Sequence, residues 1–340
     1  MSTTSSRTVS PMTMIETNGG QSWLSWLRTN QHLMVLPFLF LVALIVFAMS
    51  APGFYTVDNQ LNVSRQSVYL MLVALAQLIV LVGGGIDLSV GTIVALSSVS
   101  AAMTMSGIYD NGNGGSAAWA ITAGTLVAIA VGAIVGLING IGTAILRIPS
   151  FMMTLGMSSV VFGVALLVSG GVPVYGLPPE FGETFGYGAF LGIPAPVLVV
   201  VGAIALVYVL LEWTRYGRHL YAIGGNPRAA ALSGVRTERI TIKAFVLSGV
   251  LSALSGVLLT ARLDTGESSI GTTFPLESIA ACVIAGAALT GGVGRTLAVV
   301  AGTFLIVMVQ NGMNLMQVGA YAQTMIVGAL LIFAMAFSKK

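Results

Sequence analysis

Ten long apolar stretches, separated by short polar segments, follow one another along the chain after residue 32. A helix needs about 20 mostly apolar residues to cross a bilayer. The pattern therefore predicts an all-α integral membrane protein with about ten transmembrane helices. The eighth stretch is short, and the fourth is long enough to be tilted or broken. The predicted spans are Leu33–Ala51, Gln66–Gly83, Leu88–Gly107, Ala117–Leu146, Phe151–Gly170, Ala195–Trp213, Thr241–Arg262, Glu277–Gly292, Thr296–Met316 and Tyr321–Phe337.

The residues before the first span are polar and rich in Ser and Thr. The apolar stretch that follows is long enough to span the bilayer, which argues against a cleaved signal peptide. We therefore expect a cytosolic tail over residues 1–32 and one transmembrane domain over residues 33–340.

The basic residues indicate the orientation, because cytosolic loops of membrane proteins carry an excess of Lys and Arg. With the N-terminus inside, only Arg65 and Arg262 of the 14 Lys and Arg residues fall on the outer side. Both termini are therefore expected in the cytosol. This placement also accounts for the net charge of +3 without a nucleic-acid partner.

Composition excludes several classes of protein. Only 7% of the residues are charged, against roughly 25% in soluble domains. A single cysteine, Cys282, and two histidines leave no internal disulfide and no metal site. No nucleophile–base pair converges, so we expect neither an enzyme nor a cofactor.

The source of energy is also constrained by what the sequence lacks. No G-x-x-x-x-G-K-S/T segment occurs, and Gly291–Thr296 is expected to be a tight turn rather than a phosphate loop. A secondary carrier usually places charged groups at mid-membrane. Here Asp87 is expected near a cytosolic end and Glu277 near an outer one, so the span interiors hold almost no ionisable residue. Energy is therefore expected to come from another chain.

The segment GGGIDLSVG, Gly83–Gly91, separates the second and third predicted spans. Its glycines permit backbone shapes that other residues resist, and Asp87 or Ser89 can cap the next helix. The segment is either a membrane-embedded turn with a helix cap or a broken element that lines or gates a path.

The basic segment between the sixth and seventh spans, residues 214–241, contains signals for a short helix. Asn226 suits the N-cap, Pro227 the first helical position and Gly234 the C-terminal stop. These signals predict a helix over Pro227–Ser233, and Thr237 is expected to cap the helix of the next span. The segment either obeys the positive-inside rule and touches lipid headgroups or docks a cytosolic partner.

Three segments together resemble the permease subunits of bacterial ABC importers for monosaccharides, of the ribose, xylose, arabinose and galactose type. They are GGGIDLSVG, RYGRHLYAIGGNPRAAALSGVRTERI and ACVIAGAALTGGVGR followed by NGMNL. The resemblance runs from about Leu33 to Lys340. Matched position by position, it implies that these residues couple the chain to an ATPase: Gly224, Gly225, Asn226, Pro227, Arg228, Ala229, Ala230, Ser233 and Gly234.

The same resemblance implies the partners and the location. It implies a homodimer of permeases in the inner membrane, two copies of a separate ATPase that uses ATP and Mg²⁺, and a soluble sugar-binding protein on the outer face. Related permeases carry furanone signals, nucleosides or branched-chain amino acids. These solutes, like a self-sufficient carrier or channel, remain alternatives.

A sugar path should offer neutral hydrogen-bonding groups and aromatic rings. The candidates are either path residues or helix-to-helix hydrogen-bonding residues. They are Gln77, Asp87, Asn139, Ser150, Phe151, Thr154, Gln310, Asn311 and Asn314.

Two further expectations concern the outer face and the chain's symmetry. Glu180 and Glu183 lie in the outer loop, which is either an ordinary loop or a docking surface for the binding protein. An inverted repeat is suggested by Gly83–Gly91 matching Gly291–Gly294 and by Asn139-Gly140 matching Asn311-Gly312.

Overall fold

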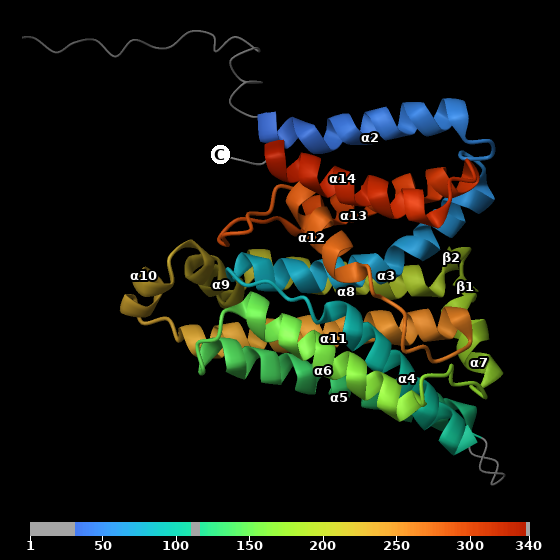
Figure 1. Ribbon diagram of the computed structural model, residues 1–340, viewed down its shortest axis with the longest axis horizontal. Helices are drawn as coiled ribbons and strands as arrows, with labels where there is room; N and C mark the ends of the chain where they lie inside the picture. The colour runs from blue at the N-terminus through green and yellow to red at the C-terminus, as the bar shows by residue number, and fades with distance from the viewer. Residues whose placement is uncertain (1–30, 110–115, 338–340) are drawn as a thin grey trace, which may run out of the picture.

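The structure, a computed structural model, describes residues 31–109 and 116–337, so nearly all of the predicted cytosolic tail lies outside the described residues. The long helices run side by side along one axis (Figure 1). The helical elements are α2 Gln31–Ser50, α3 Val57–Val82, α4 Val90–Tyr109, α5 Ala117–Ala144, α6 Ser150–Ser169, α7 Pro179–Phe181, η1 Gly182–Gly186, α8 Ala195–Tyr208, η2 Val209–Trp213, α9 Arg215–Gly225, α10 Pro227–Leu232, α11 Thr237–Leu263, α12 Phe274–Ile284, α13 Thr296–Leu315 and α14 Ala320–Phe337.

Each of the ten predicted spans overlaps a described helix. Seven helices of the described residues are long and apolar enough to cross a membrane, namely α3 to α6, α8 with its π-helical continuation η2, α11 and α13. The predicted eighth span is α12, whose 11 residues extend about 16 Å. That is about half the thickness of the hydrocarbon core. The fourth predicted span, α5, is one unbroken helix.

Helix α3 forms the centre of the bundle, because every residue from Ser67 to Val82 is buried. Helix α11 packs beside it and crosses α5 at very short range. At this crossing a Cβ on Gly132 or Gly136 would overlap the backbone of α11, and one on Gly249 would overlap the backbone of α5. Small residues allow such close approach between membrane helices, which explains the glycines at this crossing.

The two ends of the bundle differ. Helices α9 and α10 project from the end at which α2 begins and α14 finishes (Figure 1). The opposite end carries α7, η1 and the hairpin of β1 Ala189–Phe190 and β2 Ile193–Pro194. Both residues of its turn, Leu191 and Gly192, have positive φ, as the tight turns preferred in hairpins require.

Two helices, α4 and α12, begin inside the bundle after irregular segments. Their starts lie together, because a Cβ on Gly91 would overlap the carbonyl oxygen of Gly271. The glycine segments that the sequence suggested as inverted counterparts also touch each other, since a Cβ on Gly291 would lie 2.7 Å from Cα of Gly84. The inverted repeat stays a prediction.

Candidate functional site

The projecting segment consists of two capped helices, α9 and α10. The hydroxyl of Thr214 accepts a hydrogen bond from the Gly217 amide at 3.2 Å, and Asn226 Oδ1 accepts one from the Ala229 amide at 3.0 Å. Gly234 follows α10 with φ +83°. The helix predicted over Pro227–Ser233 is therefore confirmed to within one residue. We call α9 and α10 the coupling unit.

Two details of this segment differ from expectation. Thr237 is the first residue of α11 and not its cap, and the cap position, Arg236, makes no side-chain capping bond. Helix α9 was not predicted at all. Its signal was the spacing of Tyr216, Leu220 and Ile223, an apolar stripe at helical period of which Leu220 and Ile223 are buried.

The tip of the coupling unit is open to a partner. Pro227, Arg228 and Ala229 are exposed, whereas Ala230 is buried against the rest of the unit. Leu232 is 91% exposed. A rigid, capped tip that combines an arginine with an uncovered leucine has the polar and apolar parts that protein interfaces use.

The base of the coupling unit meets two segments at a junction of glycines, the one between α3 and α4 and the one between α12 and α13. A Cβ on Gly224 would overlap the Val82 carbonyl oxygen on one side and the Gly292 amide on the other. The Gly292 amide in turn donates to the Val82 oxygen at 3.0 Å. We call this contact the glycine junction. It places the end of α9 between the end of α3 and the turn that precedes α13.

A tyrosine of α9 reinforces the junction. The Tyr221 hydroxyl donates to the Gly294 carbonyl oxygen at 2.7 Å. Burial raises the pKa of Tyr221 to about 12, so this hydroxyl keeps its proton at neutral pH. Gly291–Thr296 forms a tight turn, as expected from sequence, with the Ala288 amide donating to the Val293 oxygen at 3.0 Å.

Asp87 is fully buried inside the bundle. Its Oδ1 accepts from the amide and the hydroxyl of Ser89 at 2.9 and 2.6 Å, and its Oδ2 accepts from the Ser248 hydroxyl at 2.9 Å. Ser248 lies near the middle of α11. The segment between α3 and α4 therefore carries a buried ionisable side chain that is held by α11.

Helices α5 and α6 hold the same segment from the other side. The Ser150 hydroxyl accepts from the Ile86 amide at 3.1 Å, and the Thr154 hydroxyl accepts from the Leu88 amide at 3.0 Å. Asn139 donates to the Ser89 hydroxyl at 2.8 Å. These bonds satisfy backbone and side-chain groups that would be costly to bury alone. Residues 86–89, α5, α6 and α11 thus form one polar network.

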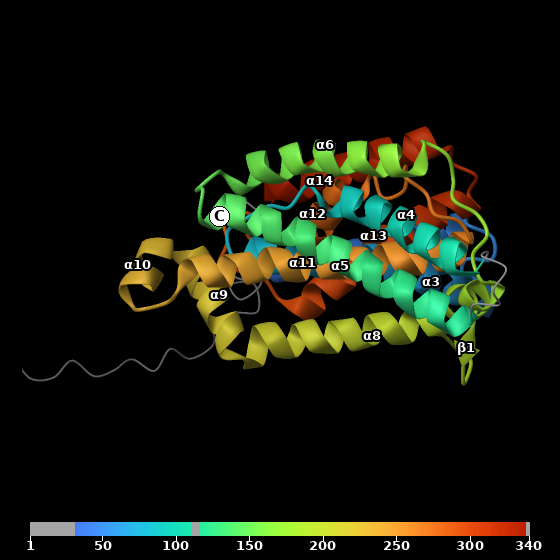
Figure 2. The ribbon, with the colours of Figure 1, turned by 90° about the horizontal axis from the view of Figure 1, so that it is seen from below.

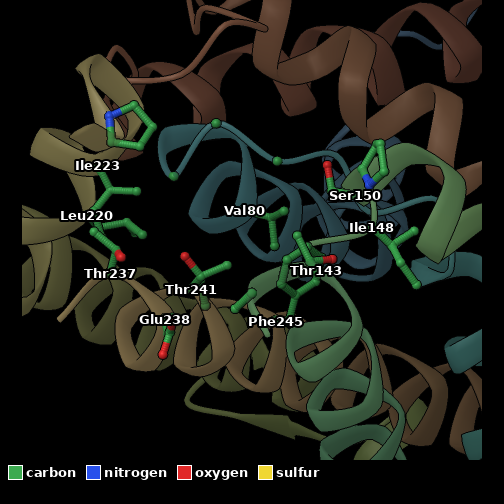
Figure 3. A pocket seen from close by; sticks show the side chains of 17 residues that line it. Val80, Thr143, Ile148, Ser150, Leu220, Ile223, Thr237, Glu238, Thr241 and Phe245 are labelled. Atoms are coloured by element: carbon green, nitrogen blue, oxygen red, sulfur yellow. The ribbon is translucent and has the colours of Figure 1, made fainter. Parts of the chain in front are cut away.

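A cavity of about 290 Å³ opens between this network and the coupling unit. Leu220 and Ile223 of α9 lie on one side of it, and Ile148 and Ser150 lie on the other (Figure 3). Thr143, Thr237 and Thr241 add hydroxyl groups to its wall, and Glu238 adds a carboxylate. Hydroxyls beside apolar walls suit a neutral polar solute, because they offer both donors and acceptors.

Comparison with known proteins identifies the family. A family model described as branched-chain amino acid transport system / permease component matches residues 59–335. This chain belongs to that family. The Ribose import permease protein RbsC of Bacillus subtilis (strain 168) is 37% identical over 307 residues, which cover 89% of this chain and 92% of that protein.

The Galactose/methyl galactoside import permease protein MglC of Escherichia coli (strain K12) is 35% identical over 327 residues, covering 93% of this chain and 95% of that protein. The resemblance to permease subunits of ABC sugar importers, first drawn from three segments, is thereby confirmed. The chain is a multi-pass membrane permease.

The path residues expected from sequence fall into separate places in this permease. Asp87, Asn139, Ser150 and Thr154 meet in the polar network. Phe151 lies in the first turn of α6, and its side chain is half-exposed. Gln310 and Asn314 lie far from the network, in a second pocket with residues of α3 and α14.

The other two expected path residues have different surroundings. Asn311 exchanges hydrogen bonds with Asn59 at 2.9 and 3.0 Å, and Asn59 also donates to the Phe54 oxygen. That arrangement favours the helix-to-helix role for Asn311. Gln77 is fully buried in α3, and its amide makes no hydrogen bond within the described part of this permease.

Glu180 and Glu183 are exposed at the end of the permease opposite the coupling unit. Glu180 lies in α7 and Glu183 in η1, beside the buried Phe181 that anchors this short segment. That these two carboxylates dock the sugar-binding protein stays a prediction.

Loss of the α10 cap tests the coupling unit. We expect Asn226→Ala to destabilise α10 by about 0.5–2 kcal/mol and to lower ATP-driven uptake several-fold, with normal insertion of the permease. Asn226→Asp is the matched control, because Asp caps as well as Asn. Equal uptake by the Ala variant and the wild-type permease would show that the cap has no part in coupling.

Proposed function

We propose that this chain translocates a monosaccharide as the permease subunit of an ABC importer in the bacterial inner membrane. It works as a homodimer over two copies of a separate ATPase, crosses the bilayer about ten times and keeps both termini in the cytosol. A soluble sugar-binding protein delivers the solute at the outer face. The ribose and galactose importers among its relatives support a sugar.

One observation carries this proposal. The coupling unit exposes its tip. Its base touches Val82, just before the segment that leads into α4, and Gly292, in the segment between α12 and α13. A partner that moves the tip therefore acts on the two segments that lead into α4 and towards α13. Mechanical coupling between sites requires an element that can move between two arrangements, and the coupling unit is placed to serve as that element.

The placement of the described ends supports the orientation. The start of α2 and the finish of α14 lie at the end that carries the basic coupling unit (Figure 1). Basic residues concentrate on the cytosolic side of membrane proteins. Figure 2 shows α10 standing clear of the long helices at that end, where a cytosolic ATPase has access to it.

A self-sufficient carrier is the second candidate, and the buried Asp87 favours it, because intramembrane carboxylates often carry protons or ions. Proteoliposomes separate the two functions. We expect sugar accumulation only with the ATPase, the binding protein and ATP present. Accumulation by this chain alone, driven by a proton or sodium gradient, would refute the ABC assignment. Uptake of leucine with the complete set of partners would refute the sugar.

The outer carboxylates give a separate prediction. Replacing Glu180 and Glu183 with Lys should weaken docking of the binding protein, and the loss should shrink as salt is raised. Uptake at limiting binding protein measures it. Gln at both positions removes the charge without reversing it and should give a smaller effect. Unchanged uptake by the Lys variant at low salt would reject this docking surface.

A further inference from the structure

A second pocket of about 320 Å³ lies away from the coupling unit, between α3, α11, α12, α13 and α14. We call it the outer pocket. Its volume reaches the range of small-molecule sites, which begins at roughly 300 Å³. Its wall consists of Gln66, Tyr69, Leu70, Leu259, Arg262, Phe274, Glu277, Val307, Gln310, Asn314 and Gln323.

The wall of the outer pocket is unusually polar for an apolar bundle. Four carboxamides line it, on α3, α13 and α14. Gln310 donates to Glu277 Oε1 at 3.1 Å, and Gln323 donates to Asn314 Oδ1 at 2.7 Å. Each carboxamide carries two donor hydrogens and an acceptor oxygen, so these pairs leave hydrogen-bonding capacity for a guest.

Tyr69 places a buried hydroxyl on the wall of the outer pocket. Its side chain is only 5% exposed, and its hydroxyl donates to no acceptor within the described residues. The Arg262 guanidinium lies close enough to act on the hydroxyl oxygen by its charge and as a donor, which leaves the hydroxyl proton to be matched. A buried tyrosine hydroxyl normally has a partner. A ligand hydroxyl in the pocket would supply one.

The floor of the outer pocket is apolar. Phe274 packs against the buried cluster of Val73, Val90 and Val94, which surrounds the start of α4. The ring of Phe274 and the ring of Tyr69 therefore present two aromatic surfaces to the pocket. Aromatic rings with a few placed polar groups are the usual composition of small-molecule sites.

We propose that the outer pocket binds one neutral monosaccharide, with the sugar's apolar face against Tyr69 or Phe274 and its hydroxyls bonded to the carboxamides and to Tyr69 Oη. This inference rests on the proposed function and names the binding site within it. The apolar floor then separates the bound sugar from the polar network around Asp87. The site receives the solute before the segment at α4 moves.

The charged members of the wall are held by neighbours. Arg262 donates to Asn62 Oδ1 at 3.4 Å, and Glu277 accepts from Gln310. A zwitterionic amino acid would be the natural guest if both charges were offered to the ligand. Both charged groups keep hydrogen-bonding capacity beyond these bonds, so the choice of a neutral sugar rests on the proposed function. An amino-acid ligand is an outcome that the test can return.

Cysteine protection tests the site in the full-length permease in lipid nanodiscs. The single native cysteine, Cys282, is fully buried, so only an introduced thiol should react with maleimide. Gln66→Cys places a thiol on the wall. Leu191→Cys, at the exposed hairpin tip, is the control. D-ribose, D-galactose, D-xylose or L-arabinose should slow maleimide labelling of the first thiol and not of the second.

A second variant isolates one hydrogen bond. In the Gln66→Cys background, Tyr69→Phe should raise the sugar concentration needed for half-protection by about two- to tenfold, as the loss of one hydrogen bond implies. Tyr321→Phe, on a 91% exposed ring, should leave it unchanged. Absence of protection by all four sugars overturns the proposal, and protection by L-leucine instead overturns the solute class.

Uptake measurements keep this proposal distinct from the proposed function. If the complete importer accumulates a sugar in proteoliposomes but none of the sugars protects the Gln66→Cys thiol, the function stands and the site is wrong. If a sugar protects the thiol but no ATP-driven uptake occurs with any partner set, the site stands and the importer assignment fails.

Discussion

Gly224→Ala is expected to lower ATP-driven uptake by about tenfold or more, because overpacking a tight contact costs about 1–3 kcal/mol. The added methyl would overlap the backbone of Val82 and of Gly292 at once. Neither neighbour is a side chain that can rotate away. The glycine junction must therefore open, and α9 must leave the two segments that it joins.

The adjacent glycine provides the control for this result. A Cβ on Gly225 meets nothing within 4 Å, so Gly225→Ala should retain uptake near the wild-type level. Both variants should insert in the membrane in similar amounts, since neither lies in a predicted span. The measurements are sugar uptake and ATP hydrolysis in proteoliposomes. Wild-type uptake by the Gly224 variant would show that the glycine junction does not transmit motion.

Asp87→Ala should produce the second large effect, a loss of about 2–5 kcal/mol in the stability of the permease. The variant removes the acceptor of three buried hydrogen bonds, two from Ser89 and one from Ser248. Unsatisfied buried donors each cost about 1–3 kcal/mol. Thermal unfolding in detergent measures the loss, and uptake should fall with it.

Two milder variants separate the causes. Ser248→Ala removes a single bond to Asp87 and should cost about 1 kcal/mol. Asp87→Asn keeps an acceptor oxygen of the same size, and the Ser248 hydroxyl can turn to accept from its amide. Its loss of stability should therefore lie between those of Asp87→Ala and Ser248→Ala. If Asp87→Ala unfolds at the wild-type temperature, the polar network does not hold this segment.

Apolar length alone located the helices of this chain, but it did not give their depth. The stretch that begins near Glu277 reads as a span, whereas α12 covers only 11 residues and continues as irregular backbone. The mean hydropathy of a stretch is the same whether its backbone is helical or is an irregular segment packed inside protein. For that reason the sequence located α12 but could not show that it is only half a span.

Local capping chemistry was predictable, and long-range contacts were not. Asn226, Pro227 and Gly234 specify α10 through neighbours a few residues away. The burial of Asp87 depends on Ser248, which lies 161 positions further along the chain. Nothing in the spacing of the GGGIDLSVG segment indicates that α11 supplies this partner, so the contact between Asp87 and Ser248 was not predicted.

Helix α11 follows α10 directly and runs unbroken for 27 residues, about 40 Å. It touches the polar network through Ser248 and the outer pocket through Leu259 and Arg262. A rigid rod of this length acts as a lever: a tilt of about 5° at the inner end moves the far end by about 3–4 Å. A small movement of the tip of α10 would then change the shape of the polar network and of the outer pocket together.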